Sequence, residues 1–440
     1  MAAGPAELHA HLYGSVAPDA VLRHLADHYD EVDWDWYEEG FAAVYGARPP
    51  TRELVERFRA GDDGVGDAFA EVYVVGDADA GDFARFSAKG RLVWATDDGT
   101  PERRDRIALG FLAAVREDLA RQGVAHAELR CQPSAVLPAA FAAGSGTGPT
   151  LRMAVSLDRD DPWPHWEQVV DVLAGPHGAA VTGIDLCGVE EGHPPTGVAA
   201  LFAAVLDFND RHPDRAVAIL HHVGESFTDK SLESAVRWVQ EAAELGAHRL
   251  GHAIALGIEP ATFGPHTRTE TVRERRDQIA YDLANRAGLR AAGVSVDPDA
   301  LHSELASLAG LPGDHELDLA YDRDRLAAVR RRQDYAIERV SRTGAVVEVC
   351  PTSNRRIGDI TDPAHHPVHR FLAAGLPVVV GADDPGVFGV TLAQELDWVC
   401  EQVAGGAGLR DQLVDASWAS RSAVLSGRAA AAAVRTRNTS

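Results

Sequence analysis

Eight short runs of β-branched or alternating residues are spread along the chain, and a loop or a stretch with helical periodicity follows each of them. The runs cover residues 7–12, 125–131, 151–157, 180–186, 216–222, 248–252, 345–350 and 377–382. Strands that alternate with helices form parallel sheets, and eight such units can close into a barrel. We therefore expect an α/β fold, a (β/α)8 TIM barrel, in which residues 1–440 form a single domain.

Two connections between the predicted strands are much longer than the others. Residues 13–124 follow the first strand and contain aromatic and acidic clusters, and residues 253–344 follow the sixth strand and contain a basic segment and a second helical pattern. Long connections in compact domains are usually functional or disordered. We expect helical insertions in both places, with the first covering the barrel mouth. For the second we favour a lid, and a solvated or oligomer-contact insert is the alternative.

Two other segments are predicted to be irregular. Residues 138–149 are rich in Ala, Gly, Ser and Thr, which is typical of a flexible surface loop. Residues 427–440 are expected to form a helix end and a flexible tail.

Composition excludes several classes of protein. The formal net charge of −24 repels phosphate backbones and anionic membrane surfaces, so neither nucleic acid nor membrane is an expected partner. The four cysteines show no CxxC spacing, which favours a reducing compartment. No apolar run is long enough for a membrane span, and cleavage of a signal peptide would remove the histidines near the start of the chain. We expect a cytoplasmic protein.

Potential metal ligands lie at the ends of the predicted strands. His9 and His11 are separated by one residue, so both side chains point to the same side of the first strand. His222 ends the fifth strand and Asp383 follows the eighth. Three neutral imidazoles and one carboxylate leave room for a water molecule, which is typical of a catalytic zinc site. Barrel enzymes place their active sites at these strand ends, so the sequence predicts a hydrolase.

Six ordered motifs carry a resemblance to a known family. They are Glu-Leu-His-Ala-His-Leu-Tyr-Gly-Ser at 7–15, Gly-Ile-Asp-Leu-Cys-Gly at 183–188, His-Val-Gly-Glu at 222–225, Arg-Leu-Gly-His at 249–252, Cys-Pro-Thr-Ser-Asn at 350–354 and Asp-Asp-Pro at 383–385. Together they resemble the adenosine deaminase family of zinc aminohydrolases, over residues 7–397. The resemblance implies that one zinc ion is bound by four residues, His9, His11, His222 and Asp383.

The resemblance also implies catalytic roles. Glu225 would act as a general acid on the purine ring, and burial would raise its pKa for that role. His252 would orient the attacking water and stabilise the developing charge. Asp383 would also take a proton from that water. A zinc-bound water becomes acidic enough to supply hydroxide at neutral pH, which is what hydrolytic deamination requires.

Four residues are predicted to contact the substrate. By the resemblance, Gly188 donates its N–H to purine N3, and a protonated Asp384 contacts N7. Ser353 follows the seventh strand together with Asn354, and there the two residues either shape the pocket or cap a turn. Tyr13 stands where the family commonly has an acidic residue that contacts the sugar side. The sugar and the 5′ group of the substrate therefore stay open, and aminodeoxyfutalosine is compatible with Tyr13.

The predicted reaction replaces the exocyclic amino group of an adenine-type nucleoside or related aminopurine with oxygen and releases ammonia. One alternative is a two-metal amidohydrolase, which would usually need a bridging lysine where Cys187 and Gly188 stand. A non-catalytic purine-binding barrel is the other. Cytidine-type zinc deaminases are excluded because their Pro-Cys-x-x-Cys motif is absent.

Overall fold

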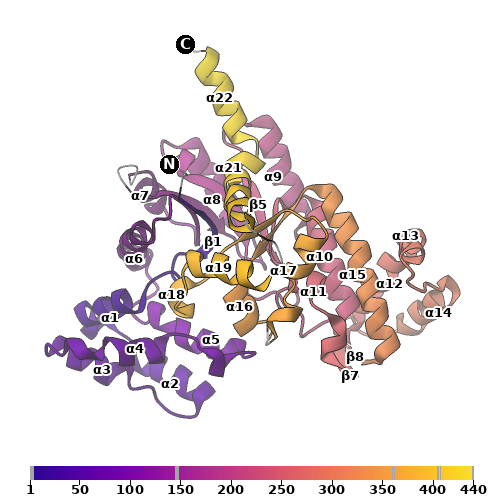
Figure 1. Cartoon of the computed structure of the whole chain (residues 1–440), viewed down its shortest axis with the longest axis horizontal. Helices are drawn as coiled ribbons and strands as arrows, with labels where there is room; N and C mark the ends of the chain where they lie inside the picture. Colours follow the sequence, from indigo (N-terminus) through magenta and orange to yellow (C-terminus); the bar gives the residue numbers. More distant parts are fainter. Residues whose placement is uncertain are drawn as a thin grey trace.

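A parallel β-barrel forms the centre of the molecule (Figure 1). The computed structural model describes residues 4–143, 148–358, 360, 362–403, 406 and 408–438. Eight strands follow the order β1-β2-β3-β4-β5-β6-β9-β10, and a parallel bridge between Ala10 and Asp383 brings the last strand back to the first. The strands are β1 (Ala6–His11), β2 (His126–Cys131), β3 (Thr150–Ser156), β4 (Val181–Leu186), β5 (Ala218–Val223), β6 (Arg249–His252), β9 (Val346–Val349) and β10 (Val378–Val380).

These eight strands are the eight that the sequence predicts, and the predicted fold class is confirmed. Every boundary lies within two residues of its expected position. The residues of β2, β4 and β5 are buried throughout. Parallel strands between a helical layer and a barrel interior are covered on both faces, so neither face of these strands is exposed to solvent.

Helices surround the barrel and end where the sequence provides caps. Ser231 caps the start of α10 by accepting a hydrogen bond from the N–H of Ser234, and Gly246 ends it with a φ of 110°. Asp322 and Gly344 do the same for α15. A serine or aspartate before a helix is an expected start signal, and a glycine after it is an expected stop signal. The outer helices are α8 (Trp163–Ala174), α9 (Ala199–Arg211), α10 (Leu232–Leu245), α15 (Arg323–Thr343), α16 (Pro351–Arg356), α17 (Val368–Ala373), α18 (Pro385–Phe388) and α19 (Leu392–Gln402).

The connection after β1 is helical, as predicted. Its helices are α1 (Pro18–Asp27), α2 (Trp34–Tyr45), α3 (Thr51–Arg59), α4 (Gly66–Tyr73), α5 (Phe83–Gly90) and α6 (Pro101–Arg121), and a short 3-10 turn covers Arg91–Trp94. Figure 1 places α1 to α5 together below one end of the barrel. Backbone hydrogen bonds from Val75 to Val387 of α18 and from Gly81 to Arg356 of α16 hold this layer against the helices that follow β10 and β9.

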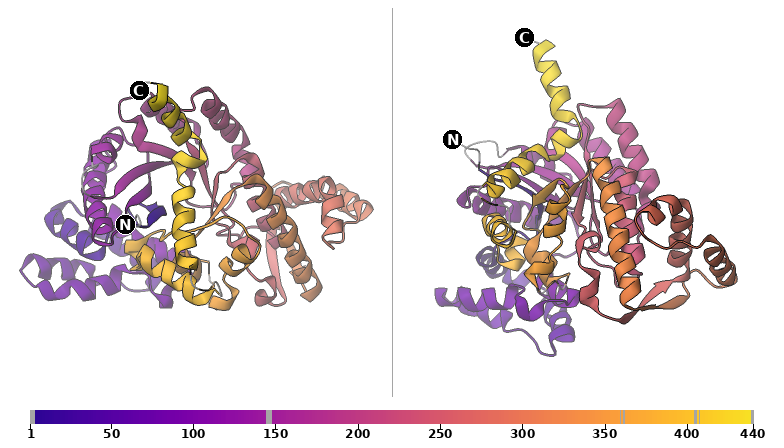
Figure 2. Two further views of the ribbon diagram at one scale, coloured as in Figure 1. Left: turned by 45° about the horizontal axis from the view of Figure 1, so that its top comes forward. Right: turned by 45° about the vertical axis from the view of Figure 1, so that its right-hand side comes forward.

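The connection after β6 differs in part from the prediction. Besides α11 (Ile254–Gly257), α12 (Val272–Ala284), α13 (Arg286–Ala291) and α14 (Pro298–Leu308), it contains an antiparallel pair, β7 (His266–Thr271) and β8 (Glu316–Tyr321). The alternating threonines of β7 favour a strand, and the prediction of a helical insertion does not include this period-2 signal. Figure 2 shows α12 to α14 projecting to one side of the barrel.

Two segments expected to be irregular contain helices. Residues 137–143 form α7 (Leu137–Ala143), so the predicted loop at 138–149 is wrong over its first part. Leu137 and Phe141 are both buried, and apolar residues four apart stabilise one face of a helix. Residues 144–147 lie outside the described part of the chain.

The chain ends in three helices. They are α20 (Leu409–Ala419), α21 (Ser422–Leu425) and α22 (Arg428–Asn438), and α22 extends away from the barrel in Figure 1. The predicted tail at 427–440 is thus helical over most of its described length. No helix within the described residues is both long and apolar enough to cross a membrane.

Candidate metal centre and active site

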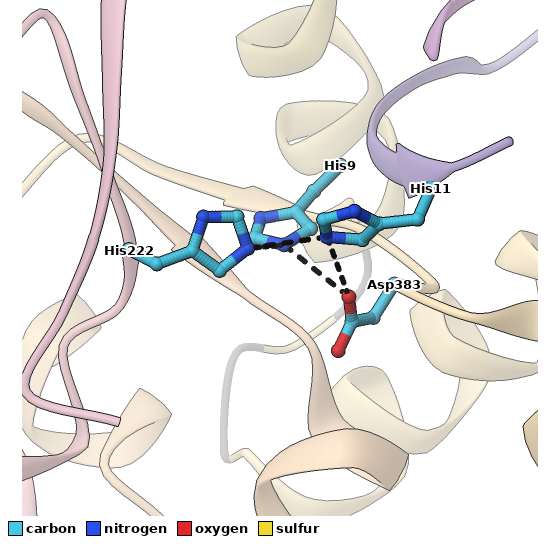
Figure 3. Close-up of side chains that lie close together, drawn as sticks. All are labelled: His9, His11, His222 and Asp383. Atoms are coloured by element: carbon cyan, nitrogen blue, oxygen red, sulfur yellow. Dashed lines mark hydrogen bonds and ion pairs between the residues drawn. The ribbon is translucent and has the colours of Figure 1, made fainter. Parts of the chain in front are cut away.

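Three histidines and one aspartate converge at the carboxyl end of the barrel (Figure 3). The Nε2 atom of His222 lies 3.1 Å from Nε2 of His9 and 3.2 Å from Nε2 of His11. An Asp383 carboxylate oxygen, Oδ1, lies 3.5 Å and 3.3 Å from the same two imidazole nitrogens of β1. In a tetrahedral zinc site with bonds of about 2.0–2.1 Å, ligand atoms are about 3.3 Å apart. The spacing of these side chains therefore fits a metal ion.

Buried carboxylates orient two of the imidazoles. His9 donates from Nδ1 to Glu348 at 2.8 Å, and His222 donates from Nδ1 to Asp185 at 3.1 Å. Each donation leaves Nε2 without a proton and directed at the shared centre. Neighbouring charges hold the pKa of both carboxyls well below the ordinary range, so both stay ionised acceptors.

Two buried arginines keep these carboxylates charged. Arg130 lies 3.0 Å from Asp185 and also pairs with Glu348, and Arg249 lies 2.7 Å from Glu348 and 2.9 Å from Glu128. Buried charges of this kind need partners on every side. These charges lie in the barrel close to the candidate metal ligands, and no role is predicted for them from the sequence. Alternating charged residues within β2 were the available signal.

Asp383 has an unusual backbone. Its φ is 59°, and in the described residues only His252 and Ala253 share a positive φ among non-glycine residues. Asp383 donates its N–H to the carbonyl of His9 at 2.7 Å and accepts the N–H of His11 at 2.8 Å. Barrel closure thus forces the strained conformation and places the carboxylate beside both histidines. Gly381 stands here because a Cβ would lie 2.5 Å from the Cβ of His9.

Glu225 lies in the loop after β5, beside the metal centre. Its carboxylate is 3.5 Å from Nε2 of His252. Burial, followed by repulsion from Asp383, raises its pKa to about 8, which keeps it protonated at neutral pH. A carboxylate that the sequence argument missed holds the loop: Glu190 accepts the N–H groups of Gly224, Glu225 and Ser226 at 2.9–3.2 Å.

His252 is oriented by a residue of α16. Its Nδ1 donates to the side-chain oxygen of Asn354 at 2.9 Å, and its Nε2 lies 4.0 Å from Asp383. Burial lowers the pKa of His252 to about 4, so the ring is neutral and Nε2 is an acceptor facing the centre. Ser353, expected near the substrate, lies on α16 with no exposed surface and is not among the described residues that line the cavity. Its neighbour Asn354 is the residue that reaches the site.

An open cavity of about 430 Å³ lies over the metal centre, which is within the usual range for small-molecule sites. Gly188, Asp384 and Tyr13 line it, as do Glu225 and His252. Gly188 has a φ of 82° and open space where a Cβ would project. A flat ring could therefore approach its backbone closely.

Asp384 is packed against the glycine that follows Tyr13. A Cβ at Gly14 would lie 1.5 Å from a carboxylate oxygen of Asp384, so a residue with a side chain would displace it. Burial and the neighbouring Asp383 raise the pKa of Asp384 well above its ordinary value. A protonated carboxyl at this place can donate a hydrogen bond, as the sequence argument required.

Three other histidines lie outside the described cavity lining. His221 points away from the centre, packs edge-on against Phe202 and is buried. His366 is buried against Trp398, 3.4 Å from the amide nitrogen of Asn354. His365 is exposed and pairs with Asp362 at 3.3 Å. None of the three lines the described cavity.

Comparison with known proteins gives consistent matches. Residues 273–418 match the family model for adenosine deaminase. The chain is 43% identical to an aminodeoxyfutalosine deaminase from Acidothermus cellulolyticus over 81 residues, 18% of this chain and 20% of that protein. It is 30% identical to an adenine deaminase from Rhizobium leguminosarum over 138 residues, 31% of this chain and 39% of that protein. The matched segments thus span less than half the length of these relatives.

A solved structure extends the likeness over nearly the whole chain. A zinc-bound amidohydrolase from Burkholderia ambifaria has a TM-score of 0.52 at 17% identity, with 95% of this chain and 85% of that chain covered. At this identity the likeness concerns the fold. Together with the sequence matches, it confirms the resemblance to the adenosine deaminase family that the six motifs predict.

Proposed function

From this resemblance we propose that the protein is a zinc-dependent hydrolase that deaminates an adenine-type nucleoside or related aminopurine. The observation that carries the proposal is the convergence of four ligand atoms beside a buried, protonated Glu225 at the floor of one cavity. His9, His11, His222 and Asp383 would hold one zinc ion. When bound, zinc supplies Lewis-acid chemistry that lowers the pKa of water from about 16 to about 7.

The side chains around the centre divide the remaining work. As water adds to the carbon that bears the amino group, electron density moves to the adjacent ring nitrogen, and the Glu225 carboxyl would protonate that nitrogen. His252 accepts a hydrogen bond from the attacking water through Nε2, because Asn354 occupies its other nitrogen. Asp383 has a second oxygen facing His252 and would take the water's proton. That proton would then pass to the amino group, which leaves as ammonia as the carbon–nitrogen bond breaks, and the hydroxyl left on the carbon would return a proton to Glu225 as the carbonyl forms.

The other contacts would fix the purine ring. The Gly188 N–H would donate to N3, and the protonated Asp384 would donate to N7. An ionised Asp384 carboxylate would instead repel the N7 lone pair, because both groups are acceptors. The substrate is thereby oriented with its amino-bearing carbon towards the centre, and this positioning lowers the entropy cost of reaction.

A two-metal amidohydrolase is less well supported. Such a site would require a bridging lysine, and the chain has lysine only at positions 89 and 230. Neither lysine lines the described cavity. Cys187 and Gly188 occupy the end of β4 instead.

Removal of the metal tests the ligand assignment. We expect about one zinc ion per chain by atomic absorption, loss of ammonia release after chelation, and recovery on adding zinc. Because a ligand that binds only the folded state stabilises it, by about 2.7 kcal/mol at 100 times its Kd, the Tm should fall on chelation. A fully active, metal-free protein would contradict the proposal.

Replacement of the acid tests the mechanism. Glu225→Gln should retain zinc and lose about 10²- to 10⁴-fold in kcat, since general acid catalysis contributes by that factor. Glu167→Gln, at an exposed position on α8, is the matched control and should keep full activity. Equal turnover in both variants would remove Glu225 from the mechanism.

A further inference from the structure

The cavity has a second wall, away from the metal centre, that is apolar and aromatic. Tyr13, Val93 and Trp94 line it, and Phe83 and Phe86 of α5 stand at its edge. The rings of Tyr13 and Trp94 lie 3.9 Å apart between centroids at an angle of 35°. Phe83 is 48% exposed although it is a large apolar residue. An exposed aromatic ring beside a cavity provides apolar surface that a bound ligand could cover.

The same cavity offers no free positive charge among its described lining residues. Arg130 is its one cation, and it is fully buried beneath the metal ligands in pairs with Asp185 and Glu348. Glu225, Asp383 and Asp384 also face the cavity, and none of these carboxyl groups can supply positive charge. A phosphate on the sugar side of the substrate would therefore find no free cationic side chain among these residues.

Cations close to the aromatic wall are already engaged. Lys89 is buried and donates to Asp79 and to the carbonyl of Val74, and Arg85 donates to the carbonyl of Ala78. Arg91 lies over the ring of Trp36, 4.1 Å from its centroid. Arg104 pairs with Asp97 at 2.9 Å. Recruiting any of these residues to a phosphate would break an existing contact.

We propose that the substrate is an uncharged aminopurine nucleoside whose sugar-side group is apolar or aromatic and packs against Tyr13, Trp94 and Phe83, and that nucleoside monophosphates are excluded. This inference rests on the proposed function, because the purine must first be oriented by the metal centre. Because the amino-bearing carbon would face the metal centre, the sugar on the opposite side of the purine ring would extend towards the helical layer that carries Phe83 and Trp94.

A substrate series on the unmodified, zinc-loaded protein tests the inference. Ammonia release would be measured with adenosine, adenosine 5′-monophosphate and 5′-deoxy-5′-(benzylthio)adenosine. We expect kcat/KM for the benzylthio compound to exceed that for adenosine, because its ring stacks on the wall, and kcat/KM for the monophosphate to be at least ~100-fold lower. A monophosphate turned over as well as adenosine would overturn the inference and leave the deaminase assignment standing. No turnover of any purine would instead refute the proposed function.

A gain-of-function variant sharpens the test. Ser87 lines the cavity on α5, and Ala84, on the same helix, is exposed outside the cavity. Ser87→Lys should raise the ratio of kcat/KM for the monophosphate to that for adenosine by about 10-fold or more, since a charge-assisted hydrogen bond becomes available. Ala84→Lys is the matched control and should leave the ratio unchanged. The same gain in both variants, or none in Ser87→Lys, would overturn the inference.

Discussion

Residues 13–124 pack on the barrel through aromatic side chains and line the cavity, whereas residues 266–321 attach to α10 through buried hydrogen bonds and ion pairs and lie outside the described cavity lining. The first segment is the connection after β1, and the second is the central part of the connection after β6, which spans residues 253–344. The sequence suggests a cover over the barrel mouth for each connection. Only the first reaches the mouth in the described structure.

Apolar contacts join the first connection to the rest of the molecule. Its buried aromatic residues, such as Tyr37, Phe69 and Tyr73, belong to the same hydrophobic cluster as the barrel helices. The ring of Phe86 stacks on Phe388 of α18, with centroids 5.6 Å apart. Contacts of this kind are non-directional, so such a wall can adapt to ligands of different shape.

Polar contacts join the second connection. Glu270 of β7 accepts from the hydroxyls of Ser231 and Ser234, and Arg237 of α10 pairs with Glu274 of α12. Many of its apolar side chains form two small clusters of their own. Buried polar contacts tolerate one geometry, so this segment is held in a defined position on α10. The two connections are similarly long but differ in position, so the length of a connection does not indicate its role. The chemistry of the residues that attach it to the barrel does.

The largest expected effect is a loss of stability without a loss of activity, when the ion pair that joins the second connection to α10 is broken. Arg237→Ala leaves Glu274 buried without its cation, which typically costs 3–5 kcal/mol. We expect the free energy of unfolding in urea to fall by about that amount, with kcat/KM for adenosine of the folded protein within about twofold of the wild type. A loss of activity at unchanged stability would place this segment in the catalytic machinery and break the comparison.

The next effect concerns the first connection. Trp94→Ala removes the ring that contacts Tyr13 in the aromatic wall. Loss of such an aromatic contact costs about 1–2 kcal/mol, so kcat/KM for 5′-deoxy-5′-(benzylthio)adenosine should fall about 10-fold, as measured by steady-state ammonia release. Trp163, 42% exposed on α8 and outside the cavity lining, provides the control. If Trp163→Ala lowered kcat/KM as much as Trp94→Ala, the wall would have no specific part in binding.

A smaller effect is the pH dependence of stability. Burial raises the pKa of Glu270 despite the two serine hydroxyls, so the folded state binds this proton more tightly than the unfolded state does. Between the unfolded and folded pKa values the stability must therefore fall as the pH rises. Glu270→Gln should give a shallower fall over that window in urea titrations at several pH values. If the free energy of unfolding fell with pH as steeply in Glu270→Gln as in the wild type, the Glu270 carboxyl would not be the source of this pH dependence.

The smallest effect is expected on the outer surface of the second connection. Arg339 of α15 pairs with Glu244 at 2.7 Å, and both side chains are about one-third exposed. Exposed pairs contribute roughly 0–1 kcal/mol, so Arg339→Ala should barely change the unfolding midpoint. A loss as large as that in Arg237→Ala would mean that exposure does not distinguish the two pairs.

Much of the barrel and its metal centre could be predicted because the signals are local. A strand shows itself as a short apolar run, and the His9–His11 spacing follows from the period of a strand. The β7–β8 pair escaped because its alternating threonines lie among charges that favour a helix. Glu190 escaped because its three acceptor contacts are with residues about 35 positions later in the chain.

The sequence by itself determined the eight strands and placed the candidate ligands His9, His11, His222 and Asp383 at strand ends, since a strand pattern depends on residues that are neighbours along the chain. Only the tertiary structure decided that Asp383 meets His9 through the barrel closure, that Asn354 orients His252, and that Glu348 is held by two buried arginines. These contacts join residues about 100 to 374 positions apart. Their geometry depends on how the strands close around a common axis, and no local pattern encodes that distance.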